Sequence, residues 1–156
     1  LNNGADPNMI DKFDFYPLEH AIYKNSDEFV TALLNSNKID FSVKIKNKFN
    51  SKETPLFESY LHLAAEASFP IFKQILEKSG IDINVEDSDG NTPLIIAVKN
   101  HKIQNVQLLF ERDDLDYLHR NNNNKNALEI ILHRGSNNTV DRKEFLMQII
   151  ALIKRE

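Results

Sequence analysis

The five histidines and two clusters of acidic residues are the side chains whose types could support catalysis or metal binding. No two histidines lie three or four positions apart, which is the spacing that places two metal ligands on one face of a helix. The segment Asp87-Ser88-Asp89-Gly90 begins like a calcium loop, but Val85 and Ile96 stand where that loop requires oxygen ligands. Residues 113–116 hold the second acidic cluster, which is expected to be a solvated loop tip. The pattern at 87–90 therefore favours a turn over a calcium site.

Other signatures of catalysis are missing from the sequence. It has no cysteine, and it contains no G-x-S-x-G nucleophile motif, no phosphate-binding Walker loop and no G-x-G-x-x-G. Without these motifs the sequence predicts neither covalent catalysis by a cysteine or serine nor nucleotide chemistry. We therefore predict that the chain is not an enzyme and needs no cofactor.

Charge and hydropathy exclude two further classes of function. The net charge is −4 at pH 7, so the chain has no overall positive field that would attract nucleic acid. No stretch approaches the roughly 20 apolar residues that cross a bilayer. A length of 156 residues suits one domain, and the absence of cysteine is typical of a reducing compartment. We expect an intracellular protein, cytoplasmic or nuclear, that binds neither nucleic acid nor membrane.

Helices must position any functional side chains, and the clearest helix start is Thr92-Pro93. Threonine suits the N-cap of a helix, and proline suits its first position. Gly90, just before them, suits a turn residue with positive φ. Similar openings recur along the chain, and inner helices are expected to begin near Pro17, Tyr60, Pro93 and Ala127.

The segment Asp87–Ala97 resembles the opening of an ankyrin repeat, whose pattern runs D-x-x-G-x-T-P-L-H-x-A. From Ser59 to Thr92 there are 33 positions, and from Thr92 to Asn126 there are 34, close to the family period of about 33. The interval from Tyr16 to Ser59 is longer, at 43 positions, which indicates an insertion. The resemblance implies an all-α ankyrin-repeat solenoid of about four helix-turn-helix repeats with short β-hairpin fingers.

The expected divisions of this single domain follow from the register of the openings. The chain starts inside a repeat, which suggests a fragment of a longer ankyrin-repeat protein, and its last helix is expected from about Asp141, as N-cap, to Lys154. The segments are 1–10 (end of a truncated repeat), 11–43, 44–86 with an inserted finger at about 44–58, 87–120, and 121–156 (a degenerate repeat with a capping helix).

The resemblance also implies a function, which is to bind another protein through the concave face and the fingers, as a monomer. The alternative is that the chain is a targeting or regulatory segment of a larger enzyme or effector whose catalytic part lies elsewhere. In the family, the position of His62 commonly bonds backbone between repeats. Asn84 resembles a site that asparaginyl hydroxylases modify in ankyrin repeats, although a structural role in bonding the hairpin is the alternative.

Aligning the repeats places a set of varied, mostly polar residues on the concave face and the fingers. Two questions remain open at this point. The insertion at 44–58 is either a binding element or a tolerated loop. The aromatic side chains of Phe13, Phe15 and Tyr23 either anchor a partner or pack locally. The predicted contact residues are Lys12, Phe13, Phe15, Tyr23, Lys24, Phe49, Glu66, Asp89, Asn91, Lys99, Asn100, Asn123, Lys125, His133 and Arg134.

Overall fold

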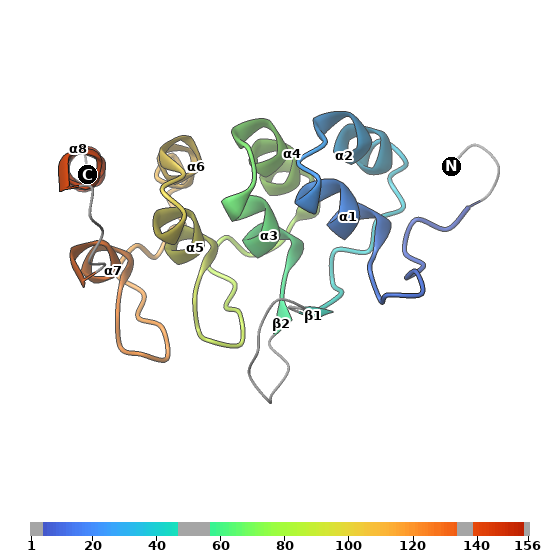
Figure 1. The fold of residues 1–156 in the computed structure, drawn as a ribbon, viewed down its shortest axis with the longest axis horizontal. Helices are drawn as coiled ribbons and strands as arrows, with labels where there is room; N and C mark the ends of the chain where they lie inside the picture. Colours follow the sequence, from blue (N-terminus) through green and yellow to red (C-terminus); the bar gives the residue numbers. More distant parts are fainter. Residues whose placement is uncertain (1–4, 47–56, 134–138, 155–156) are drawn as a thin grey trace.

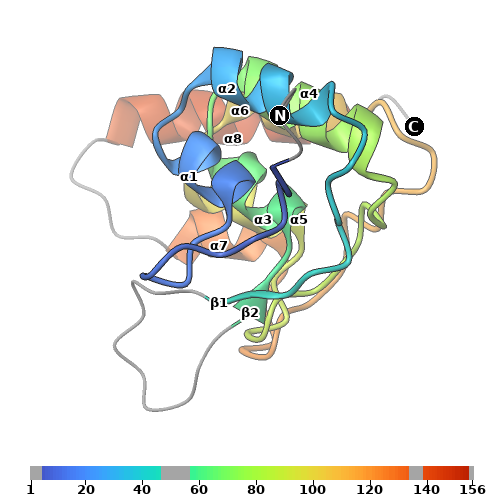
Figure 2. The same ribbon diagram turned by 90° about the vertical axis from the view of Figure 1, so that its right-hand side faces the viewer.

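The computed structural model describes residues 5–46, 57–133 and 139–154, which form a row of helical pairs (Figure 1). The inner helices make one layer and the outer helices a second layer beside it, with loops projecting on the other side of the inner layer (Figures 1 and 2). This arrangement confirms the all-α solenoid. The pairs are α1 (Pro17–Tyr23) with α2 (Asp27–Leu34), α3 (Tyr60–Glu66) with α4 (Phe69–Ser79), α5 (Pro93–Lys99) with α6 (Ile103–Leu109), and α7 (Ala127–His133) with α8 (Thr139–Ile153).

All four inner helices begin at the residues expected from the sequence. Thr92 Oγ1 accepts a hydrogen bond from the Ile95 N–H at 3.4 Å, as its N-cap position requires. In two other repeats a glutamate in the first turn accepts the N–H of the residue before the helix. The Glu19 carboxylate binds the Tyr16 N–H at 3.1 Å, and the Glu129 carboxylate binds the Asn126 N–H at 3.2 Å. Each of these three inner helices thus has a local start signal.

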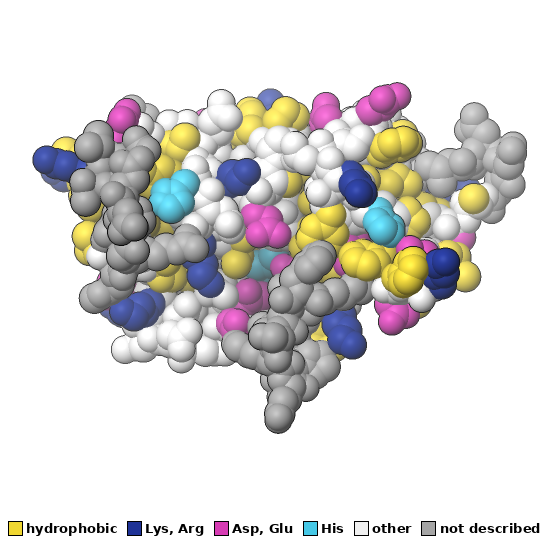
Figure 3. All heavy atoms as spheres, in the orientation of Figure 1, with side chains coloured by type: hydrophobic (Ala, Val, Ile, Leu, Met, Phe, Trp, Pro, Cys, Tyr) yellow, Lys and Arg dark blue, Asp and Glu magenta, His cyan; other side chains and the backbone are white. Residues whose placement is uncertain are grey.

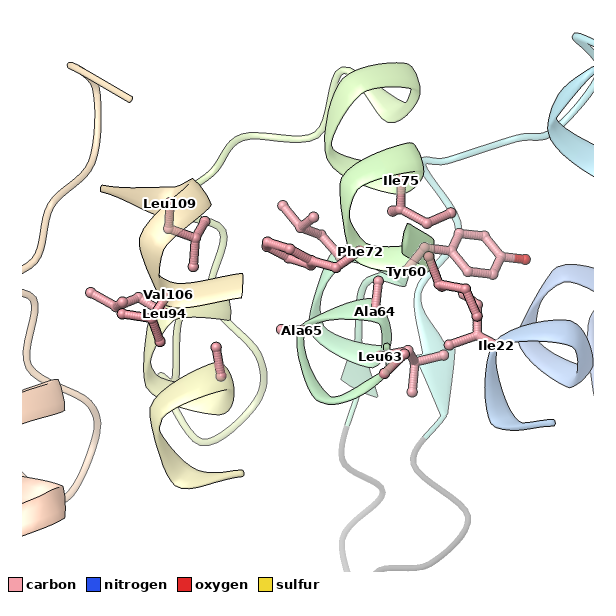
Figure 4. Close-up of a cluster of buried hydrophobic side chains, with 14 of the residues drawn as sticks. Ile22, Tyr60, Leu63, Ala64, Ala65, Phe72, Ile75, Leu94, Val106 and Leu109 are labelled. Atoms are coloured by element: carbon pink, nitrogen blue, oxygen red, sulfur yellow. The ribbon is translucent and has the colours of Figure 1, made fainter. Parts of the chain in front are cut away.

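The core runs through the stack between the two helical layers. Small residues on the inner helices, including Ala64 and Ala97, are fully buried and allow neighbouring helices to approach closely. Phe72 lies between the second and third helical pairs, on the side of Val106 and Leu109 (Figure 4). Because each unit buries its apolar face only against its neighbours, the stacking itself supplies the stability.

Three fingers share one turn geometry. We number them by repeat as finger 1 (11–15), finger 3 (87–91) and finger 4 (121–125). In each, the side-chain oxygen of the first residue accepts two backbone N–H groups, as Asp87 Oδ1 does from Asp89 and Asn91 at 2.8 Å each. The fourth residue has positive φ, and it is Asp14, Gly90 or Asn124. The Asp87 carboxylate therefore closes a turn. The sequence pattern at 87–90 favoured this role over a calcium site.

Finger 2 is the insertion, and its base is a short antiparallel ladder of β1 (Ile45–Lys46) with β2 (Phe57–Glu58). Ile45 pairs with Glu58 and is fully buried, whereas Lys46 is exposed. Successive residues of the strand thus alternate between a buried and an exposed side. Residues 47–56 lie outside the described part of the chain, and Phe49 is among them.

Neighbouring fingers are tied to one another by main-chain hydrogen bonds. The Ser88 N–H donates to the Phe57 carbonyl, and the Asn122 N–H donates to the Asp89 carbonyl, both at 3.0 Å. Ser88 Oγ also accepts the Phe57 N–H at 2.7 Å. Fingers 2, 3 and 4 thus form one connected edge.

The last helix differs from the expectation at its start. It begins at Thr139, so Asp141 is the third residue of the helix and is not its N-cap. Phe145 and Ile149 are buried and form its packing side.

Candidate protein-binding surface

The aromatic patch is a set of side chains on finger 1 and α1, namely Lys12, Phe13, Phe15, His20 and Tyr23. Phe13 is 63% exposed, and the Lys12 ammonium lies 4.9 Å from the centre of its ring. Phe15 stacks on His20 with ring centres 4.6 Å apart and meets Tyr23 edge-on at 6.1 Å. Phe13 is therefore open to a partner, whereas Phe15 and Tyr23 are half-buried against their neighbours.

A carboxylate holds the patch in place. Asp11 Oδ2 lies 3.0 Å from His20 Nε2, and Asp11 Oδ1 accepts the N–H groups of Phe13 and Phe15 at 2.8 and 3.0 Å. The hydrogen bond from His20, with those from the backbone, lowers the pKa of Asp11 to about 2. One acidic side chain thus fixes both the finger turn and the imidazole on which Phe15 stacks.

The concave face is the surface that the fingers form with the open sides of the inner helices. Tyr23, Glu66 and Lys99 end α1, α3 and α5, and so occupy equivalent positions along it. Figure 3 shows hydrophobic side chains gathered over the first repeat on the right and acidic side chains near the middle. Several other predicted contact residues are exposed or partly exposed, namely Lys24, Asp89, Asn100, Asn123 and Lys125.

A hollow of about 490 Å³, which we call the concave pocket, lies between the first and third repeats. Three residues connect α1 to α2, and three connect α5 to α6, but only Ala67 and Ser68 connect α3 to α4. This shorter turn, ending on a small alanine, leaves space between the longer turns beside it. The lining residues are Ile22, Tyr23, Asn25, Leu63, Glu66, Ala67, Ser68, Asn100 and Lys102.

The sequence prediction missed the pocket as a unit. It included three of its polar residues, Tyr23, Glu66 and Asn100, but not Asn25, Ser68 or Lys102. The signal was present in the sequence as one residue fewer between the inner and outer helices of the middle repeat. Matching the repeats by their openings alone does not reveal such a difference.

Asn91 was wrongly predicted as a partner contact. Its side chain is only 2% exposed, because its amide group links two fingers. Nδ2 donates to Asp87 Oδ2 at 2.9 Å, and Oδ1 accepts from Asn121 Nδ2 at 2.8 Å. Asn91 is therefore part of the scaffold. His133 is the last residue of α7, while the side chain of His133 and all of Arg134 lie outside the described structure.

His62 has the structural role that the resemblance implied. Its Nδ1 accepts the Ser59 N–H at 3.1 Å, so the neutral ring carries its proton on Nε2 and donates to the Asn91 carbonyl at 2.9 Å. The ring thus caps its own helix and holds finger 3. It is fully buried, and this burial lowers its pKa below the ordinary value.

This burial gives the domain a pH-dependent stability. The unfolded chain takes up a proton at His62 near pH 6.5, but the folded chain does so only at lower pH. The contribution of neutral His62 to the free energy of unfolding is therefore complete above about pH 6.5. It is lost as the pH falls toward the pKa of His62 in the folded chain. We expect urea midpoints to fall more steeply from about pH 7 to pH 5 in the wild type than in His62→Gln. Equal slopes would contradict this.

Asn84 makes the bonds expected of a structural residue. Its Nδ2 donates to the Asp114 carbonyl at 2.6 Å, and its Oδ1 accepts the Asp116 N–H at 2.8 Å. Asn8 makes the same pair of bonds with Lys38 and Asp40. Each asparagine thus joins the end of one repeat to the next repeat. Modification of Asn84 by a hydroxylase stays a prediction.

The described residues contain no cluster of three or more His, Asp or Glu side chains that could hold a metal ion. Among the helices in the same ranges, none has the length and apolar content that crossing a membrane requires.

Comparisons with known proteins agree with this architecture. A family model described as ankyrin repeats (3 copies) matches residues 61–146. A fowlpox virus (strain NVSL) ankyrin repeat protein is 34% identical over 113 residues, which are 72% of this chain and 71% of that protein. Alpha-latrotoxins of Latrodectus geometricus and Latrodectus hesperus are each 36% identical over 96 and 100 residues, but the match spans only 6% of each toxin. The family model covers more than half of this chain, and the viral protein aligns with it along most of both sequences. This chain therefore belongs to the ankyrin repeat family.

Proposed function

We propose that the chain binds a partner protein through the aromatic patch and the concave face, and that it does so without catalysing a reaction. Ankyrin repeats in general mediate contacts between proteins and in general are not catalytic. The observation that carries the proposal is the 63% exposure of Phe13 at the tip of finger 1, beside a row of chemically varied side chains.

Phe13 and Glu66 are exposed, and the turns and the core are built mainly from other side chains. Turn closure uses Asp11, Asp87 and Asn121, and packing uses the buried leucines and alanines. Large exposed aromatic residues often dominate the affinity of an interface, and charged residues at its rim contribute little. A partner segment lying across the fingers would meet an apolar end at the first repeat and a polar surface beyond it.

Replacing Phe13 and Tyr23 together by alanine is expected to weaken partner binding by about 30-fold or more, since truncating one hot-spot aromatic typically costs about 2 kcal/mol. Proteins captured from an extract of the source cells would be identified by mass spectrometry. The dissociation constant of the strongest binder would then be measured for each variant. Circular dichroism melts would establish that the variant chain remains folded.

Phe29 provides a matched control. It is 65% exposed, like Phe13, but it lies on the outer helix α2. Phe29→Ala should bind as the wild type does. If Phe29→Ala loses the partner and the concave-face variant keeps it, the wrong face has been chosen and the proposal fails.

A second candidate is that the chain serves as the binding segment of a larger protein. The alpha-latrotoxins favour it, because this chain matches a short part of each of those much longer proteins. The concave face would have the same role in either case.

A further inference from the structure

The concave pocket has walls that are already held in place. The Ser68 N–H donates to Asn25 Oδ1 of the first repeat at 2.9 Å. From the third repeat, Asn105 Nδ2 donates to the carbonyls of Ala65 and Ala67 at 3.1 and 3.3 Å. Because the short turn is bonded to both neighbours, a ligand would not have to order it, and pre-organisation of this kind favours affinity.

The charges around the pocket favour a cation. Burial is the largest cause that raises the pKa of the Tyr23 hydroxyl, and the carboxylates of Glu58, Glu19 and Glu66 add to it; of these three, Glu66 lines the pocket. Glu66 lines the pocket and is exposed, but partial burial desolvates its carboxylate and raises its pKa, while the positive charge of Lys102 acts in the opposite direction. Glu66 and Lys102 both line the pocket, but among the described residues no ion pair within 4.0 Å joins them, so a second cation placed against the Glu66 carboxylate would stabilise it.

We infer that the concave pocket binds an arginine side chain of the partner segment. The inference rests on the proposed function and specifies the partner chemistry at one site. A guanidinium group can lie against the Tyr23 ring while donating hydrogen bonds to the Glu66 carboxylate. The aliphatic part of the arginine would cover Leu63 and Ala67, which also line the pocket.

Arginine suits the site better than lysine does. Its planar group can stack on an aromatic ring and meet a carboxylate with two donors, and it is less strongly hydrated than an ammonium group. Asn25 and Asn100 line the same pocket with amide groups. The aromatic patch adjoins the pocket through Tyr23, so the partner segment should carry an apolar residue close to the arginine.

The probe for this inference is N-acetylarginine amide, titrated into the whole chain and followed by NMR. We expect saturable shifts of the backbone amides of Tyr23, Glu66 and Asn100. The neutral analogue N-acetylcitrulline amide has nearly the same shape, and it should produce shifts at least tenfold weaker at equal concentration. Equal responses to the two probes would overturn the inference, because shape alone would then explain binding.

Two charge variants have opposite expected effects. Glu66→Gln should weaken binding of the arginine probe by tenfold or more, whereas Lys102→Gln should strengthen it by removing a competing positive charge. A purely structural role for Glu66 predicts no gain from Lys102→Gln. Glu111→Gln is the matched control, since Glu111 is an exposed acidic residue outside the pocket, and it should leave binding unchanged.

The outcomes for the pocket and for the proposed function are separable. If the arginine probe fails to bind but Phe13→Ala still weakens the partner, the pocket inference is wrong and the proposed function stands. If the partner ignores every concave-face variant, the proposed function is wrong whatever the probe does.

Discussion

Leu61→Ala is expected to lower the free energy of unfolding by about 2–5 kcal/mol, as truncation of a buried leucine generally does. Leu61 is the second residue of α3 and has no exposed surface. The second helical pair lies between two others, so a cavity there disturbs contacts within the pair and with its neighbours (Figure 4). Urea denaturation followed by circular dichroism at pH 7 measures the loss.

Leu118 is the matched control for this substitution. It is 60% exposed in the loop before finger 4, so Leu118→Ala should change stability by no more than about 0.5 kcal/mol. A loss at Leu61 no greater than that at Leu118 would mean that the middle repeat does not hold the stack together.

Gly90→Ala is expected to cost about 2–5 kcal/mol, for two separate reasons. Gly90 has φ of +73°, a conformation that is unfavourable for alanine. A Cβ atom there would also lie 2.6 Å from Asn122 Oδ1 and 2.9 Å from the Asn122 backbone nitrogen. Because that nitrogen donates to the Asp89 carbonyl, relieving the clash would break a link between fingers 3 and 4. Urea denaturation of the purified variant measures the combined cost.

Gly80→Ala separates the two causes. Gly80 has a similar φ of +63°, but nothing lies within 4 Å of its added Cβ. Gly80→Ala should therefore lower the free energy of unfolding only by the cost of the backbone conformation, about 1 kcal/mol. Equal losses for the two glycine variants would show that finger 4 moves aside freely and that the clash carries no energy.

The fold was predictable because each repeat carries its own local signals. Thr92-Pro93 marks a helix start, Gly90 marks a turn, and the last three openings recur at spacings of 33 and 34 positions. His62 could be assigned from its place in the repeat, and its two hydrogen bonds agree with that assignment. Signals of this kind need no knowledge of neighbouring repeats.

The parts that were not predicted depend on pairs of repeats. Asn91 is buried because Asn121, 30 positions later, bonds to its side chain, and a single repeat gives no sign of that. The concave pocket exists because one turn is shorter than the turns on either side of it. The exposure of Phe13 at a finger tip does not depend on a neighbouring repeat. Its position was therefore the easiest part of the surface to predict from the sequence.

The links between fingers also bear on how the chain reaches its fold. Residues bonded across fingers 2 and 3 are 31 positions apart, and those across fingers 3 and 4 are 30 to 34 apart. Every such contact closes a loop of nearly the same modest length, so no repeat has to search for a remote partner. Folding can start at any neighbouring pair and extend toward both ends, and the last repeat can open and close again while the rest of the stack stays folded.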